Sequence, residues 1–349
     1  MPVSNQPVVV TGASGFIASH IVARLLEAGY RVRGTVRSPD SEKETAHLRS
    51  LPGASERLEL TRGELLEPGA FDDVVAGCQY VLHTASPYAL DVKDPQKDLV
   101  DPAVMGTRNV LASCKKAGTV ERVVVTSSMA AITDEPDADH VLTEDDWNEK
   151  STLERNAYYL SKTLAEKEAW RFVAEEKPGF DVVVINPFMV IGPSRSPGLN
   201  TSNQLFADML KGVYPGIMNL TWGFVDVRDV ALAHVRAFET KAASGRYICA
   251  NTTATMRELV EWLNEDGYTA HKLPARGLDC AVGDHVVRLT SYLQPKGVGS
   301  YLRTHVGRAP RFDNAKIRRE LGLEFRPLRD TVRETVADVV RWGHVPASR

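Results

Sequence analysis

A run of three valines followed at once by the glycine-containing turn TGASGFIAS limits the possible folds more than any other feature of this sequence. The valines predict a short strand, and an amphipathic helix is predicted over residues 16–27. Gly12 permits a tight turn, and Gly15 leaves room where the backbone must approach a phosphate. The helix N-terminus directs N–H groups and a dipole at an anion. Although the spacing is GxxGxxA and not GxGxxG, the segment predicts a cradle for a dinucleotide pyrophosphate.

The same alternation of strand and helix continues to about residue 192. Short β-branched runs such as YRVRGTV, YVLHTA, VERVVVTSS and FDVVVINP are separated by longer amphipathic stretches. This pattern predicts an α/β fold with a doubly wound parallel sheet of the Rossmann type. We expect a dinucleotide-binding domain over residues 1–192, its sheet completed by later segments. A smaller, mainly substrate-binding region over 193–349 is expected to be intertwined with it. Residues 275–305 give few periodic signals.

The composition of the chain limits the kinds of partner that it is expected to bind. The 349 residues carry a net charge of −3, and no long block of like charge is present, which argues against binding to nucleic acid. No stretch approaches eighteen consecutive apolar residues, and residues 1–7 do not resemble a signal peptide, so we expect a cytoplasmic protein with no membrane partner. The expected partner is a small-molecule carbonyl substrate, and the chain is expected to be a monomer or a homodimer.

No metal site is predicted. The four cysteines are scattered without a CxxC pair, which indicates reduced thiols. His83 and His234 have no second ligand at metal spacing. Asp226 and Asp229 are interpreted as structural, with Asp229 at the start of a helix and Asp226 as an internal partner.

The end of the second predicted strand indicates which dinucleotide is bound. An acidic residue here would accept a hydrogen bond from the ribose 2′-hydroxyl and favour NAD, but none is present. Arg33 and Arg37 stand there instead, four residues apart on one face of an extended segment, with Lys43 shortly after. Guanidinium donors suit a 2′-phosphate, so NADP(H) is the predicted cofactor. The alternative is that these arginines lie on the surface with no ligand.

A tyrosine and a lysine in NAYYLSKTLAEKEAW form a candidate acid–base pair. Tyr158 and Lys162 lie four residues apart in a predicted helix and therefore on one face. Moving a phenol pKa from near 10 to about 7 requires about 4 kcal/mol. One cation about 4 Å away, at an effective dielectric constant near 20, supplies about that amount. Tyr159, three residues from Lys162, is also within reach, so spacing alone does not choose between the tyrosines.

The strand VERVVVT runs into Ser127 and Ser128 at the carboxyl edge of the predicted sheet, where open α/β folds bind their ligands. A serine hydroxyl at this edge would hold a carbonyl oxygen while the tyrosine donates a proton to it. The hydride would come from a nicotinamide.

Together, these segments resemble the extended short-chain dehydrogenase/reductase superfamily. The segments HTASP, PAVMGTRNVL, YYLSKTLAEKEAW, INPFMVIGP and GFVDVRDVALAH are similar to the branch of dihydroflavonol reductases, cinnamoyl-CoA reductases and yeast-type methylglyoxal and ketone reductases. The resemblance covers residues 7–260 and resumes weakly in FDNAKIRRELGLEFRPL.

The resemblance implies that Tyr158 is the general acid, that Lys162 lowers its pKa and binds the nicotinamide ribose, and that Ser128 polarises the carbonyl, with Ser127 as the fallback. The residues expected to bind the cofactor are Gly12, Ser14, Gly15, Phe16, Ile17, Arg33, Arg37, Lys43, Glu64, Leu65, Thr84, Ala85, Ser86, Tyr158, Lys162, Pro187, Val190 and Ser202.

Two departures bear on the substrate. Thr133 stands where dihydroflavonol reductases have an asparagine, and NAYYLSK replaces the NWYCYGK typical of cinnamoyl-CoA reductases. We therefore expect NADPH-dependent reduction of a ketone or aldehyde to an alcohol, as in the yeast-type enzymes. Cinnamoyl-CoA or dihydroflavonol reductase activity and a nucleotide-sugar epimerase or dehydratase are the alternatives. A redox-sensing binding protein that uses the dinucleotide without turnover is a third.

Overall fold

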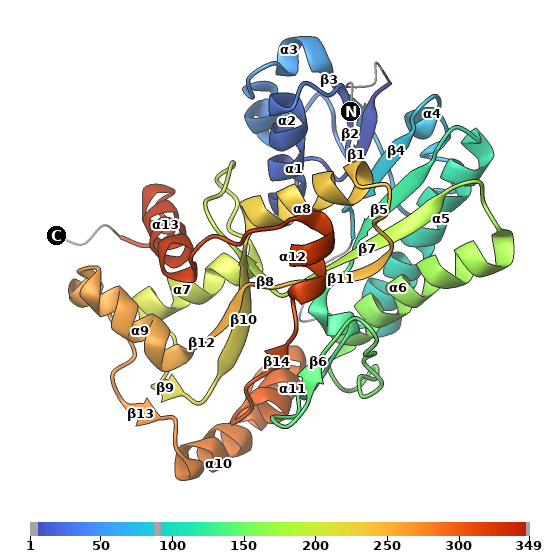
Figure 1. The fold of residues 1–349 in the computed structure, drawn as a ribbon. Helices are drawn as coiled ribbons and strands as arrows, with labels where there is room; N and C mark the ends of the chain where they lie inside the picture. Colours follow the sequence, from blue (N-terminus) through green and yellow to red (C-terminus); the bar gives the residue numbers. More distant parts are fainter. Residues whose placement is uncertain (1–5, 87–91, 347–349) are drawn as a thin grey trace.

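The fold was analysed in a computed structural model that describes residues 6–86 and 92–346 (Figure 1). Among these residues the central sheet has seven strands, all parallel to their neighbours. In spatial order they are β11 (Gly245–Cys249), β7 (Asp181–Pro187), β5 (Arg122–Thr126), β4 (Tyr80–His83), β1 (Val8–Thr11), β2 (Val32–Val36) and β3 (Leu58–Arg62). The chain winds outward in both directions from β1, which confirms the predicted doubly wound α/β fold.

Helices cover both faces of this sheet (Figure 1). Val8 and Val10 of β1 belong to the core beneath α1 (Phe16–Glu27) and α8 (Val227–Glu239). Val9, between them, belongs to the opposite core, beneath α5 (Asp101–Ala117) and α6 (Ala157–Glu176). Successive side chains of a strand point to opposite faces, so a strand covered on both sides must be apolar throughout. This double covering explains the unbroken valine runs.

A third apolar core lies in the C-terminal part of the chain. A three-stranded sheet of β8 (Met189–Ile191), β10 (Thr221–Asp226) and β12 (Thr252–Thr255) packs there with three helices. These helices are α7 (Thr201–Lys211), α9 (Met256–Glu265) and α13 (Leu328–Arg341). Residues 275–305, which gave few sequence signals, form β13 (Gly277–Leu278), α10 (Ala281–Thr290), the 3-10 turn η4 (Ser291–Leu293) and α11 (Lys296–His305).

The remaining elements are short. They are α2 (Glu42–Arg49), α3 (Ala54–Arg57), α4 (Asp72–Val75), the π-helical turn η1 (Gln96–Val100), the 3-10 turns η2 (Met129–Ala131) and η3 (Tyr268–Ala270), β6 (Val141–Leu142), β9 (Ile217–Met218), β14 (Arg311–Phe312) and α12 (Ala315–Leu321). Within residues 6–86 and 92–346, no helix is long and apolar enough to cross a bilayer.

The chain crosses between its two parts more than once. Strand β11, far beyond residue 192, pairs with β7 at the edge of the central sheet. Strand β14 likewise returns to pair with β6. Segments from both sides of residue 192 share the central sheet. The domain boundary near this residue stays a prediction.

Candidate active site

The glycine turn after β1 has the geometry that an anion cradle needs. Gly12 has φ +65°, and a Cβ there would lie 3.1 Å from that of Ala85. Its N–H donates to Oγ1 of Thr35 at 3.0 Å. Gly15 caps α1 without a side chain, and the first turn of α1 holds no acidic residue. First-turn N–H groups have no acceptor within a helix, so they face the crevice between β1 and β4, where the strand order reverses.

A single threonine fixes the neighbouring HTAS segment against this turn. Oγ1 of Thr11 accepts the backbone N–H groups of Thr84 at 3.1 Å and Ala85 at 3.0 Å. It also lies 2.9 Å from Nδ1 of His83. The hydroxyl of Thr84 donates in return to the Thr11 carbonyl. Thr84 and Ala85 are thus held beside the glycine turn, and their contact with a cofactor stays a prediction.

The structure separates the predicted arginine pair. Arg33 sits low in β2, opposite Val9, and its side chain turns away from the carboxyl edge of the sheet. Its Nε donates to Glu59 at 2.9 Å, and its Nη1 donates to the carbonyls of Asp73 at 3.4 Å, Val74 at 2.8 Å and Ala76 at 3.2 Å. These contacts fix the loop after α4 against β3. The expectation that Arg33 binds a 2′-phosphate was therefore wrong, and the residue is structural.

The other residues predicted for the adenosine end lie at the correct edge. Arg37 directly follows the last residue of β2 and is exposed, as is Lys43 on α2. Glu64 and Leu65 come just after β3, and Leu65 is held against α5, where Asn109 donates to its carbonyl at 2.8 Å. These residues stay candidates for contact with the adenosine half of a dinucleotide.

Tyr158 and Lys162 lie on one face of α6, one turn apart. The Nζ of Lys162 is 5.8 Å from the centre of the Tyr158 ring and donates to Oγ of Ser86 at 3.0 Å. The lysine is only 9% exposed, and this burial lowers its pKa to about 8. Tyr159 instead packs toward α11, with its ring 5.6 Å from that of His305. The geometry therefore favours Tyr158 over Tyr159 as the partner of the lysine.

The two serines after β5 have different surroundings. The hydroxyl of Ser127 is buried and donates to Glu166 at 2.5 Å. Oγ of Ser128 caps η2 by accepting the N–H of Ala130 at 3.1 Å, and its hydroxyl hydrogen stays available to a ligand. Ser128 also lines the same cavity as Tyr158. Ser128, and not the fallback Ser127, is thus the candidate to hold a carbonyl oxygen.

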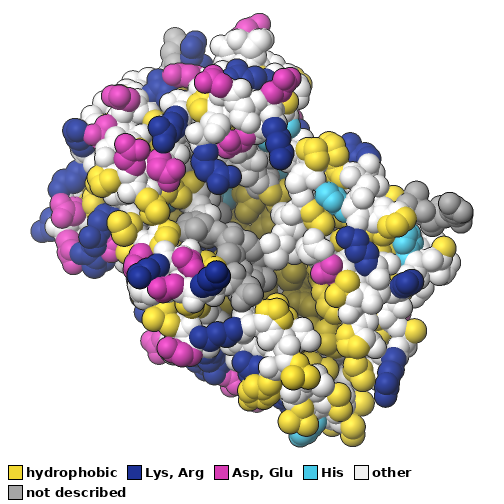
Figure 2. Space-filling model, turned by 180° about the vertical axis from the view of Figure 1, so that it is seen from behind, with side chains coloured by type: hydrophobic (Ala, Val, Ile, Leu, Met, Phe, Trp, Pro, Cys, Tyr) yellow, Lys and Arg dark blue, Asp and Glu magenta, His cyan; other side chains and the backbone are white. Residues whose placement is uncertain are grey.

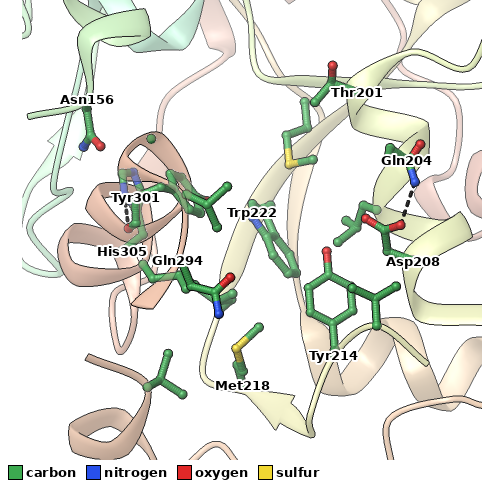
Figure 3. Close-up of a pocket in the computed structure, with 18 of the residues that line it drawn as sticks. Asn156, Thr201, Gln204, Asp208, Tyr214, Met218, Trp222, Gln294, Tyr301 and His305 are labelled. Atoms are coloured by element: carbon green, nitrogen blue, oxygen red, sulfur yellow. Dashed lines mark hydrogen bonds between the residues drawn. The ribbon is translucent and has the colours of Figure 1, made fainter. Parts of the chain in front are cut away.

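A cavity of about 1050 Å³ begins at Ser128 and Tyr158 and extends into the C-terminal part of the chain. Figure 2 shows this face hollowed and lined with hydrophobic side chains. In Figure 3, Tyr301 and His305 of α11 stand on one side of Trp222, and Tyr214, Asp208 and Gln204 stand on the other. The apolar lining includes Leu205, Met218, Leu220, Val286 and Val287. Thr133 lines the cavity as well, and residues 275–305 supply much of its wall.

Three further predicted cofactor residues fall in two places. Pro187 is buried where β7 ends, beside Cys249, and Val190 is buried in β8 of the three-stranded sheet, beside Val225. Ser202 lies on α7 and lines the cavity. Ser202 is therefore closer to a substrate role than the sequence suggested.

The acidic pair near β10 makes structural contacts, as the sequence predicts. Asp229 lies in the first turn of α8 and accepts the N–H of Arg326 at 2.8 Å. Asp226 is an internal partner that accepts the hydroxyl of Thr331 at 2.9 Å, and it also caps α8 by accepting the N–H of Arg228 at 2.8 Å. Over the part of the chain that the structure describes, no group of three or more His, Cys, Asp or Glu residues is placed to hold a metal ion.

A buried polar network beneath α6 was not anticipated from the sequence. Glu166, fully buried, accepts from Ser127, from Asn186 at 2.7 Å and from Nε of Arg246 at 2.5 Å. The network ties α6 to β5, β7 and β11. In LAEKEAW a glutamate looks like a solvent-exposed helix residue, so no local signal marks it as buried.

Comparisons with known proteins agree with this geometry. Residues 8–250 match the model of the NAD dependent epimerase/dehydratase family. The chain is 42% identical to cinnamoyl-CoA reductase CAD2 of Medicago truncatula, over 94% of each protein. It is 39% identical to tetraketide alpha-pyrone reductase 1 of Arabidopsis thaliana, over 99% of this chain and 98% of that one.

A solved structure is similar along nearly the whole chain. Yeast methylglyoxal/isovaleraldehyde reductase Gre2, complexed with NADPH, superposes with a TM-score of 0.79 at 34% identity, covering 97% of this chain and 100% of that one. The chain therefore belongs to the NAD dependent epimerase/dehydratase family and is an oxidoreductase of the extended short-chain dehydrogenase/reductase type, as its sequence predicts.

Proposed function

We propose that this protein is an NADPH-dependent reductase that converts a ketone or aldehyde to an alcohol. The observation that supports this most strongly is the placement of Ser128, Tyr158 and Lys162. Ser128 and Tyr158 open onto one large cavity, and Lys162 is held next to the segment that contacts the glycine turn. A carbonyl at this end of the cavity meets two hydroxyl donors and a buried cation.

The side chains then divide the reduction between them. Ser128 and Tyr158 each donate a hydrogen bond to the carbonyl oxygen and orient it. NADPH, when bound at the glycine turn, would supply the hydride that the carbonyl carbon accepts. As the C=O π bond breaks, the phenol of Tyr158 transfers its proton to the oxygen, and the product is the alcohol. The ammonium of Lys162, 5.8 Å from the centre of the Tyr158 ring, stabilises the phenolate left behind. Solvent returns the proton to Tyr158.

The residues around the glycine turn fit a dinucleotide. A side chain at Gly12 would crowd Ala85, and the uncapped first turn of α1 leaves N–H donors for a pyrophosphate. Exposed Arg37, just after β2, and exposed Lys43, on α2, favour a 2′-phosphate and hence NADP(H) over NAD(H). The NADPH complex of the structurally similar yeast reductase supports the same cofactor.

The substrate we propose is a bulky, mainly apolar carbonyl compound. The cavity volume of about 1050 Å³ is at the upper end of ordinary ligand pockets. Its polar groups, Gln204, Asp208 and Tyr214, lie across from Tyr301 and His305 and would contact the far end of such a molecule.

A second candidate is reduction of a cinnamoyl-CoA-like or dihydroflavonol-like substrate. It is favoured by the 42% identity to a cinnamoyl-CoA reductase and weakened by Thr133 and NAYYLSK at the site. A nucleotide-sugar epimerase or dehydratase shares the family model, and the exposed Arg37 argues for NADP(H) over the NAD(H) that such enzymes retain.

Replacing the general acid tests the reaction. Tyr158→Phe removes the transferable proton and should lower turnover of a carbonyl substrate with NADPH by about a hundredfold or more. NADPH affinity should stay nearly unchanged, as measured by fluorescence titration. Tyr159→Phe is the matched control, because Tyr159 packs toward α11. Equal turnover in Tyr158→Phe and the unmodified protein would refute the assignment.

Replacing the exposed arginine tests the cofactor. Arg37→Ala should weaken NADPH binding about tenfold more than NADH binding, because only NADPH has a 2′-phosphate for the guanidinium. Arg33→Ala is the control: Arg33 is held by Glu59 and backbone carbonyls, so its loss should leave the ratio of the two affinities unchanged. Equal losses of NADPH and NADH in Arg37→Ala would contradict the NADPH assignment.

A further inference from the structure

A glutamate lies among the donors that a 2′-phosphate would use. Glu44, on α2, accepts a hydrogen bond from the Ser14 hydroxyl at 3.3 Å. It also accepts the backbone N–H of Arg37 at 3.1 Å and that of Ser38 at 3.2 Å. One carboxylate thus joins the glycine turn to the end of β2.

These three donors form an anion-binding group. Two successive backbone N–H groups and a nearby hydroxyl converge on one point, an arrangement that binds phosphates as well as carboxylates. In doubly wound folds the adenosine ribose lies at the end of the second strand, so its 2′-substituent meets these groups. Arg37 provides one of the amides and, beside it, a guanidinium. Glu44 therefore holds donors that the 2′-phosphate of NADPH requires.

We propose that Glu44 sets coenzyme selection by competing with the adenosine 2′-phosphate for the donors of Ser14, Arg37 and Ser38. This inference rests on the proposed NADPH-dependent function. A phosphate that approaches these donors must displace the carboxylate and remain near its negative charge, which weakens binding. A 2′-hydroxyl has no charge and meets no such repulsion. Glu44 therefore reduces the preference for NADPH over NADH that Arg37 provides.

The test measures binding of cofactor fragments to the full-length protein by isothermal titration calorimetry. The probes are 2′,5′-ADP, which has the 2′-phosphate, and 5′-AMP, which lacks it. In Glu44→Gln and Glu44→Ala we expect 2′,5′-ADP to bind about fivefold tighter or more, because the competing charge is gone, and 5′-AMP to change by less than about twofold.

Glu42→Gln is the matched control. Glu42 lies two residues away on the same helix and is exposed, and its side chain makes no hydrogen bond or ion pair with any residue the structure describes. Its replacement removes the same charge from α2, and both probes should bind as they do to the unmodified protein. If Glu42→Gln matched the gain of Glu44→Gln, general electrostatics and not local competition would explain it, and the inference would be overturned.

The other outcomes separate this inference from the proposed function. If 2′,5′-ADP binds the unmodified protein and binds Glu44→Gln equally or more weakly, Glu44 only supports the loop after β2. The inference then fails, and the proposed NADPH-dependent function is unaffected. If both probes tighten together, the effect is not specific to the 2′-phosphate, and the inference again fails. If 2′,5′-ADP binds neither protein while 5′-AMP binds both, the NADPH assignment itself fails.

Discussion

At the scale of single residues, the candidate active site depends on a positive charge that is buried away from water. Lys162 is buried, and burial lowers the pKa of its ammonium from 10.5 to about 8. Holding the charged form at neutral pH costs the folded protein about 3 kcal/mol, since each pKa unit corresponds to about 1.4 kcal/mol. Above about pH 8 the cation is lost, so carbonyl reduction should decline on the alkaline side.

Lys162→Met should therefore separate activity from stability. Turnover should fall about a hundredfold or more, because the phenolate of Tyr158 loses its cation. At about pH 7 the free energy of unfolding should rise by up to about 3 kcal/mol, because an apolar side chain replaces a desolvated charge. Urea denaturation measures the second effect. Lys167→Met, on the exposed side of α6, is the control and should change neither property appreciably. A lower free energy of unfolding in Lys162→Met would contradict this, because it would mean that interactions of the ammonium in the folded protein outweigh the cost of burying it.

Single residues were also where sequence reasoning was most uneven. Gly12, Gly15, Tyr158 and Lys162 could be found because their roles depend on spacing along one strand, turn or helix. Arg33 could not be assigned correctly. Its surroundings come from β3 and the loop after α4, and four-residue spacing in a strand says nothing about which end of the sheet a side chain reaches.

At the scale of elements, the position of α6 depends on contacts beneath it. Glu166 accepts from Arg246 of β11 at 2.5 Å, and the Arg246 guanidinium also stacks on Trp147 at 3.9 Å. Both charged side chains are almost fully buried. Asn156, the residue just before α6, donates from its side chain to Asp134 and to Thr304 of α11. Tyr158 is thus placed by β11 and α11, which are distant in sequence.

Arg246→Ala should leave Glu166 buried and unpaired, and should cost about 3 to 5 kcal/mol of unfolding free energy. Arg171→Ala, on α6, is the control. Arg171 is exposed and pairs with Glu168 and Glu175, so its loss should cost much less unfolding free energy than the loss of Arg246. Denaturant titration of both variants at one pH measures the difference. Equal effects would contradict the role of the buried pair.

At the scale of the whole molecule, several neutral imidazoles are enclosed in the fold. Burial lowers the pKa of His20, His83, His234 and His305 from 6.5 to about 4 in each case. Unfolding exposes them, and they take up protons as pH falls below 6.5. The stability that they contribute is therefore complete above about pH 6.5 and is lost as pH falls toward about 4. Asp229, whose pKa burial raises to about 6, acts in the opposite direction but is a single group.

The free energy of unfolding should accordingly fall by several kcal/mol between about pH 6.5 and pH 4.5, with net proton uptake on unfolding. Urea titrations across this range measure the slope, and calorimetry in buffers of different ionisation enthalpy measures the protons. Constant stability down to about pH 4.5 would contradict burial of the neutral imidazoles.

The sequence predicted more of the overall architecture than of the cavity. Strand and helix periods are local properties, so the central sheet followed from the valine runs and the helices between them. The cavity wall could not be predicted in the same way. Residues 275–305 form short helices and turns held by contacts with α6 and β9, and no repeating pattern in their sequence indicates those contacts.

Strand β11 has a consequence for how the protein is made. On the ribosome, β7, with its apolar run Val182–Ile185, emerges some sixty residues before Gly245–Cys249, the segment that completes its hydrogen bonds. During that interval β7 is an unpaired edge strand, and its free backbone groups can pair with strands of other chains. Translation beyond residue 249 pairs β7 with β11, so a chain released before this point would leave the edge of β7 open to aggregation with other chains.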